Sequence, residues 1–191
     1  RRTTAAVDKL SRLWMVYYGE MNEIAYYDQN VQNDQNGWTT YGPGSPKTIL
    51  CDTKGGVWLV YETKLTHVHA DLTAQTWTTS DGLPTDGIYT SYVDIDGTLW
   101  YTTPYTYDLY SFNGASWTDY SSNGSNKGYP PNGMMAVTGD ETGHIYGVGV
   151  NENWHNQVYT LENSQFVKIG AEFYAVFDEK PTLTAANGYL Y

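Results

Sequence analysis

The stretch "DIDGTLWYTT", Asp94 to Thr103, decides the fold because the chain repeats it. It consists of the end of a β-branched run, a tight Asp-Gly turn and a second run that opens with Leu-Trp. An Asp-Gly pair between such runs is one of the strongest hairpin signals in a sequence. Related stretches begin at Asp8, Asp52 and Asp140, and a shorter one, "AANGYLY", covers residues 185–191. The sequence therefore predicts a hairpin that recurs five times.

The aromatic residue that follows each turn sets the period of the repeat. Successive members lie 44, 42, 46 and 45 residues apart, and they are Trp14, Trp58, Trp100, Tyr146 and Tyr191. A second aromatic follows each of the first four after 24, 19, 17 and 20 residues, at Trp38, Trp77, Trp117 and Phe166. Self-similarity at this spacing indicates a repeat architecture. We expect the tryptophans of each set to recur in register and to pack between neighbouring units.

The contents of one unit identify the architecture. In the third unit, the runs "GIYTSYVDI", "TLWYTT", "LYSF" and "SWTDY" are separated by turn signals, which makes four short antiparallel strands. Four strands every 42 to 46 residues form the blade of a β-propeller, an all-β fold. We expect the first strands near residues 5–8, 48–52, 89–94 and 134–138. The expected blades cover residues 1–47, 48–87, 88–132 and 133–181, with the start of a fifth at 182–191.

Four units and a leftover hairpin do not close a ring in the usual way. We therefore expect the chain to be a single propeller region, residues 1–191, that forms a portion of a larger ring. The alternative is self-association, because an exposed edge strand can pair with another chain. The first residue is Arg, which favours a processed or partial chain.

The third unit also carries a resemblance to known proteins. The run from Thr76, "TWTTSDGLPTDGIYTSYVDIDGTLWYTT", resembles the propeller repeat of bacterial two-component regulators, with its Gly-Leu-Pro, Asp-x-x-Gly and Leu-Trp elements. The first unit, with "RLWMVYYGEMNEIAYYD", resembles more weakly the blades of fucose-binding fungal lectins. The first resemblance implies a sensor-like binding module in the extracellular space or periplasm. The second implies a carbohydrate-binding lectin.

The composition excludes several classes of partner. A net charge of -11 would repel the phosphates of nucleic acid and disfavours anionic membrane surfaces. No apolar stretch approaches the roughly 20 residues that a membrane-spanning helix needs, so we expect no membrane insertion in this segment. The single cysteine, Cys51, cannot form an intramolecular disulfide, and we expect it to be buried in its apolar run. We expect a secreted protein, extracellular or periplasmic.

Few residues carry the pattern of a metal or catalytic site. The Asp-x-x-Gly turns at Asp94 and Asp140 lack the ligand series of a calcium loop, so we interpret these aspartates as turn caps. His67, His69 and Asp71 alternate along the chain, so they lie on one strand face, where two imidazoles and a carboxylate could bind zinc. No further ligands are evident. We therefore favour the explanation that these residues form the half-exposed polar face of an outer strand. The sequence also shows no nucleophile elbow, triad or phosphate loop. We predict no cofactor, no metal and no catalytic residue.

Aromatic residues that depart from the repeat indicate a ligand site. They lie in connections that a propeller places on one face, beside residues with amide and carboxylate groups. An aromatic ring can stack on the C–H face of a sugar while such groups bond its hydroxyls. The predicted ligand-binding residues are Tyr105, Tyr107, Asp108, Tyr129, Trp154 and Asn156.

Three functions remain open from the sequence. The favoured one is a non-catalytic, sensor-like module that binds a carbohydrate, another neutral small ligand or a protein partner. The first alternative is a lectin with glycan sites in loops or between blades. The second alternative is a propeller enzyme such as a glycosidase or lyase, whose converging ionisable groups a sequence does not reveal.

Overall fold

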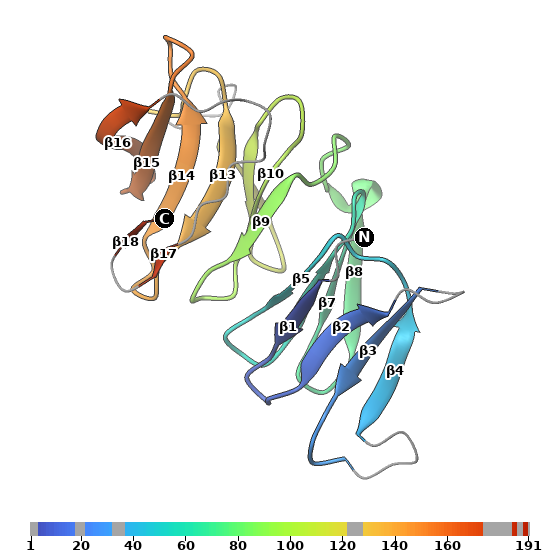
Figure 1. Ribbon diagram of the computed structural model, residues 1–191. Coiled ribbons are helices and arrows are strands. Elements are labelled where there is room, and N and C mark those ends of the chain that lie inside the picture. Colours follow the sequence, from blue (N-terminus) through green and yellow to red (C-terminus); the bar gives the residue numbers. More distant parts are fainter. Residues whose placement is uncertain are drawn as a thin grey trace. The chain divides into compact units, whose positions relative to one another are not determined.

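The computed structural model describes residues 4–17, 22–31, 37–121, 128–173, 185–186 and 189–190, the last two pairs as backbone only. The only helical segment among them is one 3₁₀ turn, η1 (Thr79–Asp81). The chain divides into two compact units, Arg1–Leu83 and Pro84–Tyr191, here called unit 1 and unit 2. Figure 1 labels most of their strands and colours them along the sequence. In this described part of the chain, no helix has the length and apolar character to cross a membrane.

Unit 1 consists of two four-stranded antiparallel sheets whose strands lie in sequence order, as Figure 1 shows for β1 to β4. Blade 1 contains β1 (Ala5–Val7), β2 (Leu13–Tyr17), β3 (Glu23–Tyr27) and β4 (Trp38–Pro43). Blade 2 contains β5 (Thr48–Cys51), β6 (Val57–Val60), β7 (Lys64–Val68) and β8 (Ala74–Thr78). Buried side chains of the two blades form one apolar cluster: Trp14, Val16, Ile24 and Tyr26 from blade 1, and Ile49, Val57, Leu59 and Val68 from blade 2.

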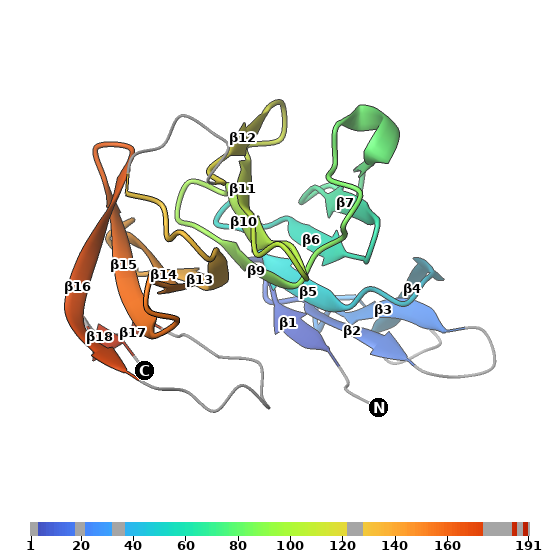
Figure 2. The same ribbon diagram turned by 90° about the horizontal axis from the view of Figure 1, so that it is seen from above.

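Unit 2 repeats this arrangement and adds a short hairpin. Blade 3 contains β9 (Thr90–Val93), β10 (Leu99–Thr102), β11 (Leu109–Phe112) and β12 (Trp117–Asp119). Blade 4 contains β13 (Met134–Gly139), β14 (Ile145–Val150), β15 (Asn156–Glu162) and β16 (Gln165–Phe173). Figure 2 shows β13 to β16 side by side in this order. The hairpin pairs β17 (Ala185–Ala186) with β18 (Tyr189–Leu190).

The predicted repeat and fold class are confirmed. The first strands expected near residues 5–8, 48–52, 89–94 and 134–138 are β1, β5, β9 and β13, and each opens a four-stranded antiparallel sheet. The turns between first and second strands also fall where the Asp-containing motifs placed them. The hairpin β17–β18 lies at the fifth, shortened copy of the motif.

One aspartate side chain organises the first turn of every blade. Its Oδ1 atom accepts hydrogen bonds from the backbone N–H groups two and four residues later, at distances from 2.7 to 3.0 Å. These bonds satisfy donors that a tight turn leaves without backbone partners. The turn-cap interpretation is therefore confirmed for Asp94 and Asp140, and Asp8 and Asp52 cap their turns in the same way.

The second oxygen of this carboxylate binds a different donor in different blades. The indole N–H of Trp14 donates to Asp8 at 2.9 Å, and that of Trp100 donates to Asp94 at 2.8 Å. In blade 2 the Oδ2 atom of Asp52 instead lies 2.7 Å from Nε2 of His67. Blade 2 therefore keeps the turn aspartate of the repeat but pairs it with an imidazole in place of the indole.

The registers confirm one set of aromatic markers and correct the other. Trp14, Trp58 and Trp100 are each the second residue of the second strand and lie opposite equivalent positions of the first strand. In the second set, Trp38 and Trp117 pair with the last residue of the preceding strand, but Trp77 pairs with Leu65, three residues beyond its hairpin. The expectation that Trp77 shares this register is wrong. Its ring instead lies beside Trp58, with centroids 5.7 Å apart.

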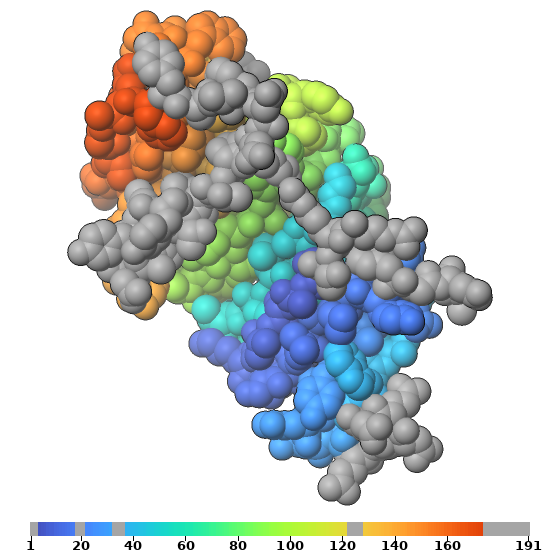
Figure 3. Space-filling view, viewed as in Figure 1, coloured from blue at the N-terminus to red at the C-terminus, as the bar shows by residue number. Residues whose placement is uncertain are grey.

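The face of blade 1 opposite Trp14 and Val16 carries exposed side chains. Val7 and Tyr17 are each 61% exposed, and the blade's surface is coloured blue in Figure 3. Met15, Ala25 and Trp38 border a shallow depression of about 250 Å³ on this face. An apolar sheet face of this kind fits the expected portion of a larger ring, in which a further blade would cover it.

Candidate functional site

Three segments of unit 2 meet on one surface, which we call the connection face. They are the β10–β11 connection (residues 103–108), the segment 128–133 before β13 and the β14–β15 connection (residues 151–155). The backbone oxygen of Tyr107 accepts hydrogen bonds from the N–H of Met134 and the hydroxyl of Tyr129, both at 2.7 Å. The side-chain amide of Asn132 donates to the backbone oxygen of Asn151 at 2.7 Å. These bonds join the segments into one continuous surface.

The two connections are closed in the same way. In the first, the N–H of Thr103 donates to the oxygen of Asp108, whose own N–H donates to Oγ1 of Thr103 at 3.0 Å. In the second, the N–H of Asn151 donates to the oxygen of His155, whose N–H donates to Oδ1 of Asn151 at 3.1 Å. In each connection, the side-chain oxygen of the first residue thus accepts the backbone N–H of the last residue.

Aromatic residues in these connections adopt a left-handed backbone. The φ angles are 68° at Tyr105, 55° at Tyr107 and 61° at Trp154. Bulky residues rarely take such values, because their Cβ crowds the backbone, and each instance costs roughly 1–3 kcal/mol. The strained backbone displays two rings to solvent, since Tyr105 is 89% exposed and Trp154 is 68% exposed.

The other predicted site residues serve the structure of the connections. Tyr107 packs against the buried cluster of Met135, Ala136, Val148 and Val150. Burial raises the pKa of Tyr129, whose hydroxyl donates to the backbone of Tyr107. Asp108 closes the first connection, and Asn156 is only 1% exposed at the start of β15. Of the six predicted residues, Tyr105 and Trp154 present their side chains at the surface.

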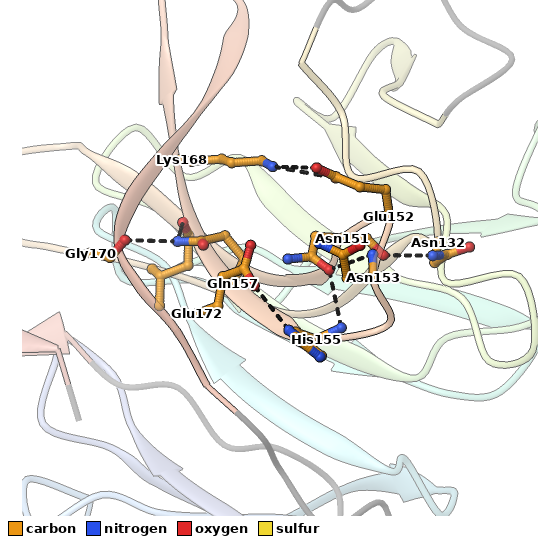
Figure 4. A network of polar contacts seen from close by, with 10 residues as sticks. Asn132, Asn151, Glu152, Asn153, His155, Gln157, Lys168, Gly170 and Glu172 are labelled. Carbon is orange, nitrogen blue, oxygen red and sulfur yellow. Dashed lines mark hydrogen bonds and ion pairs between the residues drawn. The ribbon is translucent and has the colours of Figure 1, made fainter.

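Two pairs of ionisable side chains link the β14–β15 connection, which carries Trp154, to β16 (Figure 4). Nδ1 of His155 lies 2.9 Å from Oε2 of Glu172, and Nζ of Lys168 donates to Glu152 at 3.3 Å. The pairing register of β15 and β16 shifts between Asn156 and Val158, which brings Glu172 within reach of His155. A sequence pattern does not reveal such a bulge, so the pair could not have been predicted.

A second polar feature lies in blade 2 at the turns β5–β6 and β7–β8. His67 belongs to the third strand, β7, and His69 to the turn that follows it, so the expected outer-strand location is wrong. Both line a depression of about 390 Å³ together with Asp52, Lys54, Gly56, Ala70 and Asp71. Within the described ranges, no three His, Cys, Asp or Glu side chains are grouped as ligands for one metal ion.

The stability of unit 1 should depend on pH through His67 and Asp52. Burial lowers the pKa of His67 below its ordinary 6.5 and outweighs the bond to Asp52, which acts in the opposite direction. Burial raises the pKa of Asp52, but hydrogen bonds from His67 and the turn outweigh burial and hold that pKa below its ordinary 3.8. Both pKa values are lower in the folded state than in the unfolded chain. The stability that the two groups contribute is therefore complete above pH 6.5 and declines as the solution is acidified.

We therefore expect the melting temperature to fall as the pH is lowered from 6.5 to 5, where unfolded chains bind protons that His67 in the folded protein does not. Thermal melts at half-unit intervals of pH measure this slope. The variant His67→Gln should show a smaller slope in that range. An unchanged slope in the variant would mean that other groups cause the acid sensitivity.

Comparison with known proteins identifies the fold. No protein-family model and no curated protein matches the sequence. Among solved structures, a streptogramin B lyase matches 98% of this chain at 14% identity, with a TM-score of 0.65. The extracellular domain of BT4673 from B. thetaiotaomicron, named as a one-component system, matches 92% at 16% identity and a TM-score of 0.53. YCF48 bound to D1 peptide matches 84% at 10% identity and a TM-score of 0.53.

These similarities and the four-stranded blades define the chain as a β-propeller protein. The similarity to the BT4673 domain confirms the resemblance to sensor propellers at the level of the fold. The chain spans 60%, 22% and 49% of the lyase, BT4673 and YCF48 chains, respectively. At these identities the comparison shows the fold and leaves the activity to be argued from the site.

Proposed function

We propose that the chain is a non-catalytic binding module of the sensor type, extracellular or periplasmic, which binds its ligand at the connection face of unit 2. The observation that carries this proposal is the pair of exposed rings, Tyr105 and Trp154, on left-handed backbone. Strain of this kind persists only where the surrounding structure imposes it, and it is often found at ligand sites. The similarity to an extracellular sensor domain supports the same reading.

The chemistry of the face favours a neutral, hydroxyl-rich ligand such as a carbohydrate. The two rings offer flat apolar surfaces for stacking on C–H groups. His155 and Glu152 belong to the same connection as Trp154, and with their partners Glu172 and Lys168 they offer donors and acceptors for hydroxyl groups. The net charge of -11 disfavours an anionic ligand. A protein segment is the other partner that such a face suits, and the similar protein YCF48 binds a peptide.

The test is the loss of binding when each ring is removed. We expect Trp154→Ala and Tyr105→Ala each to weaken binding roughly tenfold, because one stacked ring contributes about 1 kcal/mol beyond burial. A glycan array provides the ligand, and titration calorimetry measures the affinity. Trp154→Phe keeps an aromatic face and should retain most of the affinity. Tyr17→Ala, at a ring in unit 1 that is 61% exposed, is the matched control and should leave the affinity unchanged.

Thermal melting of the same variants decides between a site and packing. Both rings are largely exposed, so the melting temperatures of Trp154→Ala and Tyr105→Ala should stay close to that of the parent protein. A large fall would show that the rings pack against the fold, and the site assignment would then be wrong. If several blades bound glycans, that result would instead favour the alternative function, a lectin with glycan sites in loops or between blades.

An enzyme is the second candidate, because a His–carboxylate pair lies on the same face. Nδ1 of His155 is 2.9 Å from Glu172, and the two side chains are 25% and 40% exposed. A carboxylate that orients an imidazole in this way can support a general base. The lyase among the similar structures makes turnover worth testing. If the chain is an enzyme, it should convert a bound ligand, and His155→Ala should abolish that turnover. If it is a binding module, the parent protein should show no turnover of the ligand.

A further inference from the structure

Two histidine rings lie against each other at the rim of the blade 2 depression. The ring centroids of His67 and His69 are 4.6 Å apart, at an interplanar angle of 74°. The His67 ring is held in place, because it stacks on Trp58 with centroids 4.3 Å apart. His69 is exposed and follows β7 directly, so its ring can turn about its own bonds. The chain thus places a fixed imidazole beside an adjustable one.

Asp52 determines which nitrogen of His67 is available. Its Oδ1 atom accepts the backbone N–H groups of Lys54 and Gly56 at 2.7 and 2.8 Å, so Asp52 serves this turn as an acceptor carboxylate. Nε2 of His67, 2.7 Å from Oδ2 of Asp52, must therefore carry the proton, and in the neutral ring the lone pair lies on Nδ1. A carboxylate that fixes the tautomer through the other ring nitrogen is the usual support of a metal-bound histidine.

The depression remains open because residue 56 is glycine. A Cβ atom there would lie 2.7 Å from Oδ2 of Asp52 and 2.9 Å from Nε2 of His67, so any other residue would crowd the pair. Of the charged groups that line the depression, Asp52 and Asp71 favour a cation and Lys54 opposes one. The corresponding aspartates of blades 1 and 3 bind an indole instead, so only blade 2 combines this carboxylate with two imidazoles.

We propose that His67 and His69 bind one divalent transition-metal ion of the imidazole-preferring class, Cu²⁺, Ni²⁺ or Zn²⁺. The two imidazoles are the protein ligands, Asp52 orients the first of them, and water completes the coordination. Bonds of about 2.0–2.1 Å from the ion to each nitrogen are within reach of rings this close once His69 turns. Imidazole nitrogens select these metals over Mg²⁺ and Ca²⁺, which prefer oxygen.

The experiment is titration of the whole chain with Cu²⁺, Ni²⁺ and Zn²⁺ by calorimetry, with electron paramagnetic resonance of the Cu²⁺ form. We expect one site that binds these ions and excludes Mg²⁺, with a Cu²⁺ spectrum showing two nitrogen ligands. The His69→Ala variant should lose at least about tenfold in affinity. Its side chain is exposed, so it should fold normally. His67→Ala should lose binding as well.

His144→Ala is the matched control, because that imidazole lies 3.0 Å from the turn carboxylate of blade 4, Asp140, but has no second histidine beside it. The chain has only four histidines, so His155→Ala completes the set. Neither control should change the affinity or the spectrum. Equal losses in all four variants, a one-nitrogen spectrum, or an affinity unchanged in His69→Ala would each overturn the proposal.

Discussion

Replacing Arg12 by alanine is expected to destabilise unit 1 by about 3–5 kcal/mol, the usual effect of removing one partner from a buried ion pair. Arg12 is 5% exposed, and its Nε atom donates to Oδ2 of Asp8. Its two terminal nitrogens donate to the backbone oxygens of Gly55 and Ala70, both at 3.1 Å. One guanidinium therefore joins the first turn of blade 1 to two turns of blade 2.

The substitution removes three hydrogen bonds and leaves a buried carboxylate without its counter-ion. Urea unfolding measures the change, and Arg12→Lys should be intermediate because an ammonium cannot span the same three acceptors. Lys47→Ala is the matched control, since Lys47 forms an exposed pair with Glu62 at 3.3 Å. Exposed pairs contribute about 0–1 kcal/mol. If Arg12→Ala lowered the unfolding free energy by a similarly small amount, Arg12 would not contribute to stability by joining the two blades.

The second large effect is expected for Asp94→Ala, in unit 2. The Asp94 carboxylate accepts backbone hydrogen bonds from Asp96 and Thr98 and the indole N–H of Trp100. Its loss leaves that buried indole N–H without this acceptor and the turn without its cap. We expect a loss of about 2–4 kcal/mol, since an orphaned buried donor alone costs about 1–3 kcal/mol.

Asp96→Ala is the control for Asp94→Ala, because it removes a carboxylate two residues away that is exposed. It should change the unfolding free energy by less than about 0.5 kcal/mol. Trp100→Phe isolates the indole contribution, and combining it with Asp94→Ala should cost less than the sum of the two single changes. Full additivity would show that the carboxylate and the indole act independently.

The architecture could be predicted because it rests on local signals. The Asp-containing turns and the aromatic that follows each of them lie within a few residues, so their pattern is visible along the chain. The register of Trp77 could not be predicted in this way. Its hairpin closes between Val68 and Ala74, so Trp77 lies further along its strand than the aromatics of the other blades do. Spacing alone does not report where a hairpin closes.

The candidate site was predicted only in part, for the same physical reason. Tyr105 and Trp154 interrupt the repeat, and that interruption is visible in the sequence. Whether a ring in a connection faces solvent depends on tertiary contacts, and Tyr129 became a packing residue through its bond to Tyr107. The pair of His155 and Glu172 depends on a shift of register between two strands. Contacts set by a bulge or by a neighbouring blade leave no periodic signal.

The aspartate turns also differ in how much of a blade must be present before each turn is complete. In blades 1 and 3 the carboxylate finds all its turn partners and its indole within six residues, so two strands suffice to form the motif. In blade 2 the partner of Asp52 is His67, fifteen residues away on the third strand. Closing a longer loop costs more entropy and slows its formation. During synthesis, the first hairpins of blades 1 and 3 can form as soon as they emerge, whereas the turn of blade 2 gains its imidazole only when the third strand docks.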